Sequence, residues 1–456
     1  MTTVSRPSTI EPSGTILTPS DPGWDEARMA WNLAVDQRPA AVARVRSPED
    51  VVAAIEFARE RGQRVAAQGT GHNAGALGSL DDTVLVKTEA MRRVDVDAGA
   101  RTARVEAGAV WLDVVEAAGA HGLAALAGSS PDVGVVGYTL GGGLSWLGRS
   151  YGLSASNVAA IEVVTADGRI RRVDNKHEPE LFWALRGGGG SFGVVTAIEL
   201  RLFPVTEVYA GVLWWPIERG REVLQRWLEL TQSGLPEALT TVGRYLQLPP
   251  LPEIPEPVRG KSFVVVEVIH LGPPAEADEL LSPLRALEPV MDTVETIPVQ
   301  ALTRLHMDPE HPVPGKGDGV LLGELSAEAI DELVRVAGVD AGSPLLSVEV
   351  RHLGGRLARS EPGDGALASI EADYAMFAVG IVPTPEAAAA VGAHLEAVKA
   401  TMAPWTARHM YLNLAETRRD PSTFWSDDAY GRLRRIKAEV DPTDLIRSNH
   451  PISPHS

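Results

Sequence analysis

A single histidine stands inside a glycine-rich run near the start of the chain, Gly69-Thr70-Gly71-His72-Asn73-Ala74-Gly75. Glycine adopts positive φ, so the backbone of such a run bends sharply and turns several N–H groups toward one point, which can hold a pyrophosphate without cationic side chains. The neutral imidazole of His72 is a good nitrogen nucleophile near neutral pH. The run therefore predicts a nucleotide-binding loop that carries a nucleophile.

The run also matches the dinucleotide-binding pattern G-x-G-x-x-G/A through Gly69, Gly71 and Ala74. That pattern must open a helix that packs on the preceding strand. The residues that follow instead contain two helix breakers and show no helical period of apolar side chains. We therefore expect a loop between two strands, at residues 64–68 and 83–87.

Four further segments follow in a definite order. A second glycine cluster spans residues 128–143 and has six glycines in sixteen residues. A third cluster lies at residues 183–196, Tyr411-Leu412-Asn413 comes much later, and residues 441–450 form the tail. Each segment alone is a weak signal, and it is the order of all five that identifies a type of protein.

This order resembles the flavoproteins with a vanillyl-alcohol-oxidase-type FAD domain, and within them the branch of berberine bridge enzyme and the bacterial hydroxynicotine, sugar and polyketide oxidases. The resemblance covers nearly the whole chain. It implies that the cofactor is FAD and that His72, at the position of the family's tethering histidine, forms a covalent bond to the 8-methyl group of the flavin ring. Relatives with a second tether use a cysteine where this chain has Ser130, and the chain has no cysteine. The resemblance therefore implies one covalent link at most.

The same resemblance implies the other FAD-binding residues. They come from all five segments: Gln68, Gly69, Thr70, Gly71, His72, Asn73 and Gly75; Gly128, Ser129, Ser130, Asp132, Gly134, Gly137, Tyr138, Gly141 and Gly142; Gly193 and Val195; Tyr411 and Asn413; and Asn449. Two positions depart from the family pattern, because Gln68 stands where relatives often have an arginine and Ser156 where many have an aspartate. The pyrophosphate would then depend more on backbone N–H groups and nearby helix ends.

Flavin oxidation of an alcohol or amine carbon moves a hydride to the ring and requires a base for the O–H or N–H proton. Tyr411 is the leading candidate, because it matches the tyrosine of the family's Tyr-x-Asn segment, and Tyr138 is the second. Asn413 matches the residue that helps to fix the flavin or the substrate. A phenol titrates near about pH 10, so a base role requires a positive neighbour or a hydrogen-bond relay. The alternative for Tyr411 is a buried tyrosine that packs on the flavin.

The third cluster offers a different chemistry, because Gly189-Gly190-Ser191-Phe192-Gly193 satisfies the G-x-S-x-G pattern of serine hydrolases. Such a nucleophile needs a strand before the serine and a helix after it. Here residues 180–186 have helical spacing and residues 194–202 alternate as a strand does, so the order is reversed. Ser191 is therefore kept only as the nucleophile of an alternative hydrolase.

The composition agrees with a soluble enzyme but does not choose among enzymes. A formal net charge of −18 disfavours binding to nucleic acid or to an anionic membrane. The absence of cysteine excludes thiolate catalysis and iron–sulfur clusters, and the eleven histidines show no ligand spacing, so we expect no metal. Residues 1–7 lack the start of a signal peptide, and no apolar stretch is long enough to span a membrane. We therefore expect a cytoplasmic protein.

The elements that must position these residues fall into three stretches, which together predict an α+β fold. Residues 1–206 alternate helix and strand as a FAD-binding domain would, and residues 207–408 are expected to form an α+β substrate domain with a one-sided antiparallel sheet covered by helices. The resemblance implies that residues 409–456 return to the FAD-binding domain. The expected helices are residues 48–61, 110–121, 221–231, 275–287, 327–337 and 385–402; the strands of the substrate domain are 208–215, 262–270, 346–353 and 374–381; and loops are expected at 248–258 and 311–319.

The substrate site is expected where the flavin lies between the two domains. On the strand at 346–353, Glu349 and Arg351 point to one face and His352 to the other, and either face could line the cleft. We predict a FAD-dependent oxidase that takes a hydride from a C–OH or C–NH carbon of a sugar, an alkaloid-like amine or a polyketide and passes the electrons to O₂. The alternatives are a dehydrogenase with another electron acceptor, a flavin-binding protein without turnover, and the hydrolase. The sequence predicts neither the particular substrate nor an oligomeric state.

Overall fold

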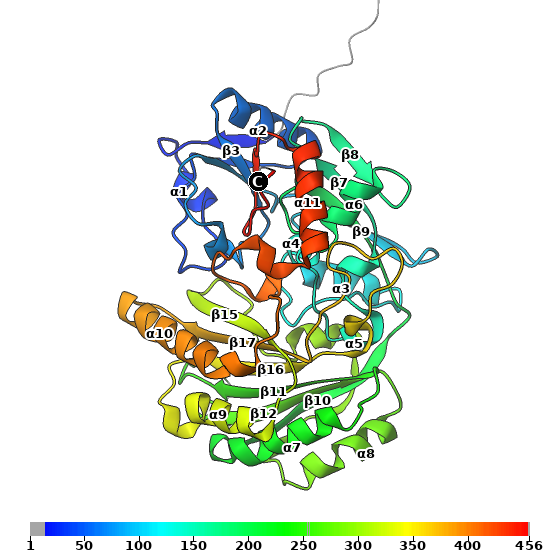
Figure 1. The fold of residues 1–456 in the computed structure, drawn as a ribbon, viewed down its shortest axis with the longest axis vertical. Coiled ribbons are helices and arrows are strands. Elements are labelled where there is room, and N and C mark those ends of the chain that lie inside the picture. The colour runs from blue at the N-terminus through cyan, green and yellow to red at the C-terminus, as the bar shows by residue number, and fades with distance from the viewer. Residues whose placement is uncertain (1–13, 253, 255, 455–456) are drawn as a thin grey trace, which may run out of the picture.

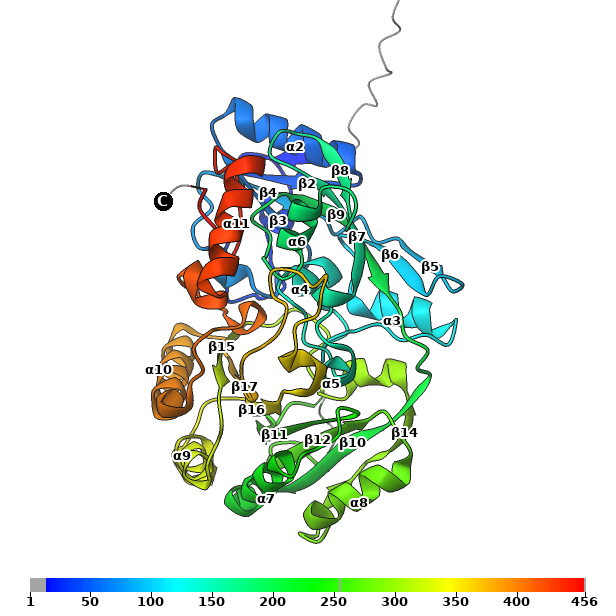
Figure 2. The ribbon, with the colours of Figure 1, turned by 45° about the vertical axis from the view of Figure 1, so that its right-hand side comes forward.

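The computed structural model describes residues 14–252, 254 and 256–454, so the expectation for residues 1–7 lies outside the described part of the chain. The described residues form three β-sheets. Figures 1 and 2 show two of them in the upper half of the molecule and the third in the lower half, with the C-terminal segment, in red, back in the upper half. The mixed α/β arrangement matches the expected fold class.

The first sheet contains the strands on both sides of the histidine loop. Its order is β1 (Thr15–Leu17), β2 (Ala41–Arg44), β4 (Thr83–Lys87), β3 (Arg64–Gln68) and β18 (Ile446–Arg447). All pairs are parallel except β1 with β2 at the edge. Helix α2 (Pro48–Glu60) packs on this sheet. Its first turn is capped by Ser47, whose hydroxyl accepts the N–H of Asp50, an interaction that stabilises a helix by about 1 kcal/mol.

The second sheet is antiparallel and carries the second and third glycine clusters on its connections. Its order is β5 (Val94–Asp97), β6 (Thr102–Glu106), β9 (Val194–Arg201), β7 (Val158–Val164) and β8 (Ile170–Val173). One apolar core joins this sheet to α3 (Trp111–Gly119), α4 (Val135–Leu140), α6 (Pro179–Leu185) and α11 (Asp427–Val440). The C-terminal helix α11 therefore packs with elements of the first half of the chain, as Figure 2 shows. Two short helices, α1 (Trp24–Ala27) and α5 (Gly148–Tyr151), complete this half.

The third sheet is antiparallel and forms the lower half. Its order is β13 (Met291–Asp292), β10 (Glu207–Pro216), β12 (Ser262–His270), β11 (Leu239–Gln247), β16 (Ser347–His352), β17 (Tyr374–Ile381) and β15 (Gly315–Leu322), with β14 (Glu295–Pro298) also on β10. One face packs against α7 (Gly220–Gln232), α8 (Pro274–Arg285), α9 (Ala327–Ala337) and α10 (Pro385–Met402). The other face packs against residues 124–147 of the upper half.

Most of the expected elements are present with small differences at their ends. The predicted bounds are exact for six elements: β3, β4, β12, β17, α9 and α10. The bounds differ by one or two residues at an end for α2, α3, α7, α8, β10 and β16. The loop expected at residues 311–319 is wrong in its second half, because β15 begins at Gly315 and pairs with β17. Its glycines lower the local preference for a strand, and the tertiary pairing overrides that preference.

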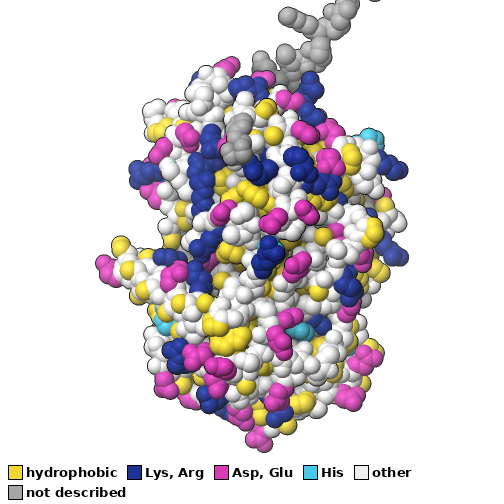
Figure 3. Space-filling model, viewed as in Figure 1, with side chains coloured by type: hydrophobic (Ala, Val, Ile, Leu, Met, Phe, Trp, Pro, Cys, Tyr) yellow, Lys and Arg dark blue, Asp and Glu magenta, His cyan; other side chains and the backbone are white. Residues whose placement is uncertain are grey.

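The described surface carries charges of both signs. On the face shown in Figure 3, acidic and basic side chains are intermixed. No helix among the described residues is long and apolar enough to cross a membrane. In the same part of the chain, no group of three or more His, Asp or Glu side chains is placed to hold a metal ion.

Candidate functional site

The histidine loop follows the carboxyl end of β3, and the chain then returns to the amino end of the parallel strand β4. After Gly71 the chain makes a single 3₁₀ turn, Ala74–Leu77, rather than a helix packed on β3, which confirms the expected loop. Gly71 has a φ of 88°, and a Cβ there would lie 2.8 Å from Nε2 of Gln68 and 2.9 Å from Cβ of Ala30. Only glycine fits this sharp bend without displacing its neighbours.

His72 is held by the second glycine cluster. Its Nε2 lies 3.2 Å from the carbonyl oxygen of Asp132 and 3.5 Å from Oδ1 of the same residue. A carbonyl oxygen only accepts hydrogen bonds, so Nε2 carries the hydrogen and Nδ1 keeps its lone pair. Burial lowers the pKa of His72 despite the nearby Asp132 carboxylate. The imidazole is therefore neutral near pH 7 and presents a nucleophilic nitrogen.

Two further side chains complete this corner of the site. The indole ring of Trp31 stacks on the His72 ring with centroids 3.9 Å apart, and its N–H donates to Oδ2 of Asp132. The hydroxyl of Ser130 donates to Oδ1 of Asp132 at 2.9 Å. The structure therefore brings His72, Ser130 and Asp132 together, as expected, and adds Trp31, which the sequence did not single out.

The tail of the chain closes over the same loop. Nδ2 of Asn449 donates to the carbonyl of Asn73 at 2.8 Å, and Nδ2 of Asn73 donates to the carbonyl of Ala415 at 3.1 Å. Residues from both ends of the sequence thus meet at the histidine loop. These contacts place the C-terminal segment against the half of the molecule that contains the first two sheets.

The rings of the two candidate tyrosines lie against neighbouring glycines of the second cluster, to which Tyr138 itself belongs. Tyr138 is in α4, and its ring occupies the space that a Cβ on Gly143 would need, 2.5 Å from Cε1. A Cβ on Gly142 would lie 3.0 Å from Cε2 of Tyr411. Asn413 ties the two together, because its Nδ2 donates to the carbonyl of Tyr138 at 2.9 Å.

Burial raises the pKa of both phenols, so both are protonated near neutral pH. The positive charge of Arg351 opposes this effect and lowers the pKa of each phenol. The backbone N–H of Gly143 and the side chain of Asn413 also lower the pKa of Tyr411, although neither reaches hydrogen-bond geometry with its Oη. Arg351 is therefore the positive neighbour that a tyrosine base at this place requires.

Arg351 comes from the face of the third sheet that lies toward the upper half. Its guanidinium carbon stands 4.6 Å above the Trp146 ring, and its Nη2 donates to Oε1 of Glu349 at 3.1 Å. His352 points to the opposite face, where its ring lies 5.5 Å from that of Tyr374. The sequence did not decide which face of this strand lines the cleft. In the structure, the face with Glu349 and Arg351 lies at the seam between the upper and lower halves.

Glu349 belongs to a buried set of charges that the sequence did not predict. Its Oε2 lies 2.8 Å from Nε2 of His306, and Nδ1 of His306 lies 2.8 Å from Oε2 of Glu267. Glu267 in turn accepts from Nη1 of Arg244 at 3.2 Å. Burial alone would lower the pKa of His306, but the two carboxylates raise it to about 9. The imidazole is therefore charged at neutral pH.

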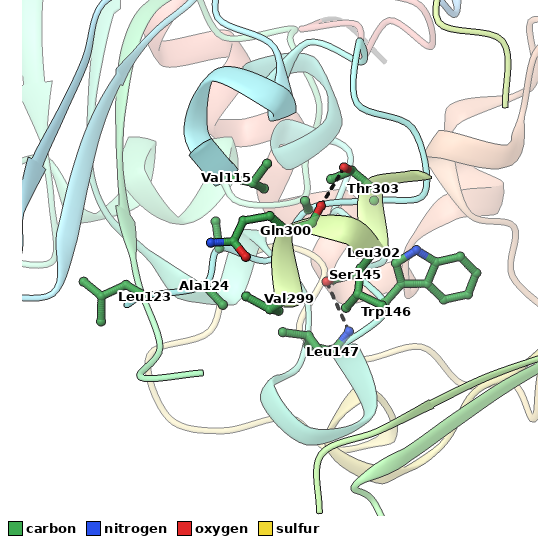
Figure 4. A pocket seen from close by; sticks show the side chains of 13 residues that line it. Val115, Leu123, Ala124, Ser145, Trp146, Leu147, Val299, Gln300, Leu302 and Thr303 are labelled. Atoms are coloured by element: carbon green, nitrogen blue, oxygen red, sulfur yellow. Dashed lines mark hydrogen bonds between the residues drawn. The ribbon is translucent and has the colours of Figure 1, made fainter. Parts of the chain in front are cut away.

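A cavity lies at the same seam, between α3, the loops at residues 123–128 and 145–147, and the 3₁₀ segment Val299–Arg304 (Figure 4). Its lining is mostly apolar, and no ionisable side chain is part of it. Trp146 and Gly128 belong to the lining, so the cavity adjoins the second cluster without offering groups for acid–base chemistry.

The third cluster does not form a hydrolase site. Ser191 is 1% exposed, its Oγ lies 2.8 Å from Oγ of Ser448, and it accepts the N–H of Ile452 at 3.1 Å. Helix α6 precedes it and β9 follows it, so the reversed order is confirmed. A nucleophilic serine needs a base in hydrogen-bond reach. No histidine in the described part of the chain is bonded to Ser191.

Gly193 and Val195 lie at the start of β9. A Cβ on Gly193 would lie 2.5 Å from Cγ2 of Val163, so the missing side chain lets β9 pack on β7. Val195 is 3% exposed within the core of the second sheet.

The residues around the loop and the tyrosines fit FAD. Buried polar atoms without a partner in the described part of the chain include both amide atoms of Gln68, Oδ1 of Asn73, and Oη of Tyr138 and of Tyr411. A Cβ on Gly137 would meet no atom within 4 Å. Buried polar atoms normally have partners, so these atoms and this space suit a polar ligand that supplies them.

Comparison with known proteins places the chain among flavoproteins. Residues 39–174 match the FAD binding domain family, and residues 410–453 match the family described as berberine and berberine like. The chain is 28% identical to (R)-6-hydroxynicotine oxidase of Paenarthrobacter nicotinovorans over 460 residues, which is 97% of each chain. It is 35% identical to glucooligosaccharide oxidase of Sarocladium strictum over 227 residues, 48% of this chain and 45% of the relative.

The fold agrees with that relationship. The crystal structure of 6-hydroxy-D-nicotine oxidase from Arthrobacter nicotinovorans superposes with a TM-score of 0.84 at 24% identity, covering 99% of this chain and all of the other. The match extends over both halves of the molecule. The two-layered upper half and the antiparallel lower sheet are thus features of a known flavoprotein fold.

Proposed function

Since the chain belongs to the FAD-linked oxidoreductases of the berberine bridge enzyme type, we propose that it is an oxidase that takes a hydride from a C–OH or C–NH carbon of a small organic molecule and returns the electrons to O₂. The observation that carries the proposal is that the second glycine cluster contacts two distant segments, His72 through Asp132 and the segment of Tyr411 through the bond from Asn413 to Tyr138. FAD, when bound, supplies the hydride acceptor.

The groups that would hold FAD come from the same segments. Backbone N–H groups of the loop at residues 69–75 suit the pyrophosphate, and the unpartnered side chains of Gln68 and Asn73 lie beside it. Asn449 braces this loop from the tail through the carbonyl of Asn73. Residues 128–142, with Gly193 and Val195, bring backbone close to the rest of the cofactor.

We assign the covalent tether to His72. Burial keeps its imidazole neutral, and the hydrogen bond from Nε2 to Asp132 leaves Nδ1 as the nitrogen with a free lone pair. Ser130, at the position of a second tether, has a hydroxyl in place of a thiol and donates it to Asp132. One link through His72 is therefore the expected state.

We assign the exchange of the substrate proton to Tyr411, with Tyr138 as the second candidate. Oη of Tyr411 is buried and unpartnered, and Asn413 fixes the segment that carries it. Burial makes the phenolate costly, and Arg351 and the N–H of Gly143 reduce that cost. A hydroxyl or amine of the substrate in reach of this oxygen could pass its proton to it.

The first test is the absorption spectrum of the purified protein, followed by denaturation and a search for flavin fluorescence in the polypeptide fraction. Yellow protein whose fluorescence stays with the chain supports a tethered flavin. Yellow protein that releases its flavin retains the cofactor assignment and removes His72 as the tether. Protein that stays colourless after growth with riboflavin contradicts the proposal.

A dehydrogenase with another electron acceptor is the second candidate, since the same hydride transfer precedes either reoxidation. Oxygen consumption during turnover distinguishes the two. A flavin-binding protein without turnover would show no bleaching of its flavin with any substrate under anaerobic conditions. The relatives named above act, by their names, on 6-hydroxynicotine and on a glucooligosaccharide, so amines and sugars both belong in that screen.

A further inference from the structure

A second cavity, of about 270 Å³, lies on the first sheet, outside the segments assigned to FAD. Its lining comes from β1, from α1 and the turn before it, and from the carboxyl ends of β2 and β4 with the residues just after them. None of the lining residues belongs to the histidine loop, the second and third glycine clusters, the Tyr-x-Asn segment or the tail at residues 441–450. The carboxyl ends of parallel strands are a common place for ligands in open α/β sheets.

Three cationic side chains line this cavity. Arg44 is the last residue of β2 and Lys87 the last of β4, and the two are partners in the register of the sheet. Their side chains therefore point to the same face. Arg46 follows two residues after Arg44 and lines the same cavity. The lining holds two carboxylates, those of Glu26 and Glu89, so its charge is positive in a chain whose formal net charge is −18.

Lys87 is the buried member of this set, with 3% of its surface exposed. Its Nζ donates to the carbonyl of Met29 at 2.7 Å, and Oε2 of Glu89 lies 3.8 Å away, which is too long for a hydrogen bond. An ammonium group has three N–H donors, so two of them have no acceptor in the described part of the chain. Burial lowers the pKa of Lys87, because the cation has lost water without gaining a close counter-ion.

Glu89 shows that an anion fits between two of these cations. Its Oε1 lies 3.4 Å from Nη2 of Arg44, and its Oε2 lies 3.8 Å from Nζ of Lys87. Both distances exceed the roughly 2.7–2.9 Å of a hydrogen bond between charged groups. The side chain of Glu89 is 43% exposed, and an exposed ion pair of this length contributes little stability. A ligand with shorter contacts can therefore displace it.

From these contacts we propose that the cavity binds the phosphate group of a small molecule, with Lys87 and Arg44 on the oxygens that Glu89 now faces and Arg46 on a third. A phosphate group has three terminal oxygens and a charge of about −1.5 to −2 near neutral pH, so it can pair with three cations at once. A carboxylate has two oxygens and one charge, and it would leave one of the cations without a partner. This site goes beyond the proposed function and does not depend on it.

The rest of the cavity suits the body of a phosphate ester. Leu17, Pro22 and Ala90 supply apolar surface, and Thr15 supplies a hydroxyl. Free phosphate would contact only the cationic end. An ester would bury part of its carbon skeleton against the apolar residues as well, and burial of apolar surface is favourable.

The test measures the binding of inorganic phosphate to the purified holoenzyme by isothermal titration calorimetry, in phosphate-free buffer at constant ionic strength. The holoenzyme is used because an empty cofactor loop would itself attract phosphate. We expect saturable binding at one site, with a dissociation constant of about 1 mM or lower. Acetate should bind much more weakly. Phenyl phosphate that binds more tightly than inorganic phosphate assigns the cavity to a phosphate ester, and equal binding of the two assigns it to free phosphate.

Substitutions at the cavity test which residues hold the phosphate. Arg44→Gln and Arg46→Gln should each weaken its binding by roughly tenfold or more, as expected for a hydrogen bond to a charged group. Glu89→Gln removes the competing carboxylate and should strengthen binding. Lys87→Met should also weaken binding, but it releases the carbonyl of Met29, so the two arginine variants carry the test.

Arg92→Gln is the matched control. The side chain of Arg92 is 53% exposed, close to the 52% of Arg44, and it pairs with Asp113, which does not line the cavity. The substitution changes the net charge of the protein by the same amount as Arg44→Gln. It should leave phosphate binding unchanged.

The outcomes separate a built site from general attraction to positive charge. Phosphate that does not saturate, or that binds no better than acetate, overturns the inference. Binding that neither Arg44→Gln nor Arg46→Gln weakens, or that Arg92→Gln weakens equally, overturns it as well. Flavin content is measured on every sample, because flavin lost together with phosphate binding would place these arginines in the cofactor site instead. Phosphate binding that falls while flavin content stays unchanged supports a separate site.

Discussion

Trp31 stacks on His72 with ring centroids 3.9 Å apart and an angle of 20° between the planes. Its indole N–H binds the carboxylate of Asp132, and the carbonyl of that residue holds Nε2 of the imidazole. One face and one nitrogen of His72 are thus fixed before any cofactor arrives. This arrangement leaves Nδ1 as the nitrogen available for bond formation.

The first prediction concerns the tether itself. In the protein with His72→Ala we expect FAD to remain bound but to be released on denaturation, because the loop and the tail keep their other contacts. The measurement is flavin fluorescence in the protein band of a denaturing gel, beside total flavin released by acid. His177→Ala, which removes an exposed histidine paired with Asp174, serves as the control. Fluorescence that persists in the His72→Ala band would show that the tether lies elsewhere.

The second prediction concerns Trp31. Trp31→Leu removes both the stacking and the N–H to Asp132, so we expect covalent attachment of FAD to slow by roughly tenfold or more. Trp31→Phe keeps an aromatic ring without the N–H, so its rate of covalent attachment should lie between those of Trp31→Leu and the wild type. Attachment is followed as the growth of denaturation-resistant fluorescence after apoprotein is mixed with FAD. Equal rates in all three proteins would mean that Trp31 does not position His72.

The third prediction concerns Tyr411. With a substrate that enters protonated, Tyr411→Phe should reduce the rate of anaerobic flavin bleaching by roughly 10² to 10⁴-fold, the usual contribution of a positioned acid–base group. Tyr430→Phe, a conservative change in α11 on the outside of the upper half, is the control. An unchanged bleaching rate would assign Tyr411 to packing and move the search for the base to Tyr138.

The fourth prediction concerns pH and His306. Its pKa in the folded protein, about 9, lies above the value of about 6.5 expected for the unfolded chain. The folded state therefore binds this proton more tightly, and the stabilisation is complete below pH 6.5 and lost as the pH rises through 9. The difference corresponds to up to about 3 kcal/mol.

Chemical denaturation between pH 6.5 and 9.5, on both sides of the pKa of His306, measures this change. The upper part of that window avoids Glu416, whose pKa burial raises to about 7. His306→Gln should be less stable throughout, because it leaves two carboxylates without their cation, and should lose the slope above pH 7.5, beyond the pKa of Glu416. A slope that survives the substitution would come from another group.

The sequence predicts an element well where local signals agree with the fold. α9 and α10 each begin after a capping hydroxyl, Ser326 and Thr384, and both have the predicted bounds. β11 was not predicted, because Gly243 interrupts its apolar pattern. In the structure that glycine makes room for α7, since a Cβ there would lie 2.9 Å from Cδ2 of Leu224. Gly243 is therefore required for the packing of α7 on the sheet, although in the sequence a glycine argues against a strand.

The sequence predicts site residues that lie in recognisable segments. It does not predict the buried charged residues that distant strands bring together. The histidine loop is predicted from its own residues, whereas the second cluster and the Tyr-x-Asn segment are identified only by the order of all five segments. The chain from Arg244 through His306 to Arg351 joins three strands and a loop, and no local pattern connects them. One signal was present, because Glu267 interrupts the apolar run of β12, and a charge at such a buried position requires a partner.

The last prediction concerns the way the tail reaches the cofactor loop. Lys437 is fully buried in α11, and its ammonium group binds the carboxylate of Asp441 and the carbonyls of Ser191 and Ile446. Lys437→Met should cost about 3 to 5 kcal/mol of unfolding free energy, because it leaves the Asp441 charge buried without a counter-ion. Denaturant unfolding measures this loss. Arg432→Met, which breaks a partly exposed pair with Glu180, should cost less than about 1 kcal/mol.

The same substitution tests whether the tail matters for the flavin. Lys437 binds the carbonyl of Ile446 in β18, three residues before Asn449, whose amide holds the carbonyl of Asn73 in the histidine loop. If this path positions the loop, Lys437→Met should lose flavin at lower denaturant than the wild type when His72→Ala removes the tether from both proteins. If the stability falls but flavin is released at the same denaturant concentration as in the His72→Ala parent, the tail supports the fold and not the cofactor.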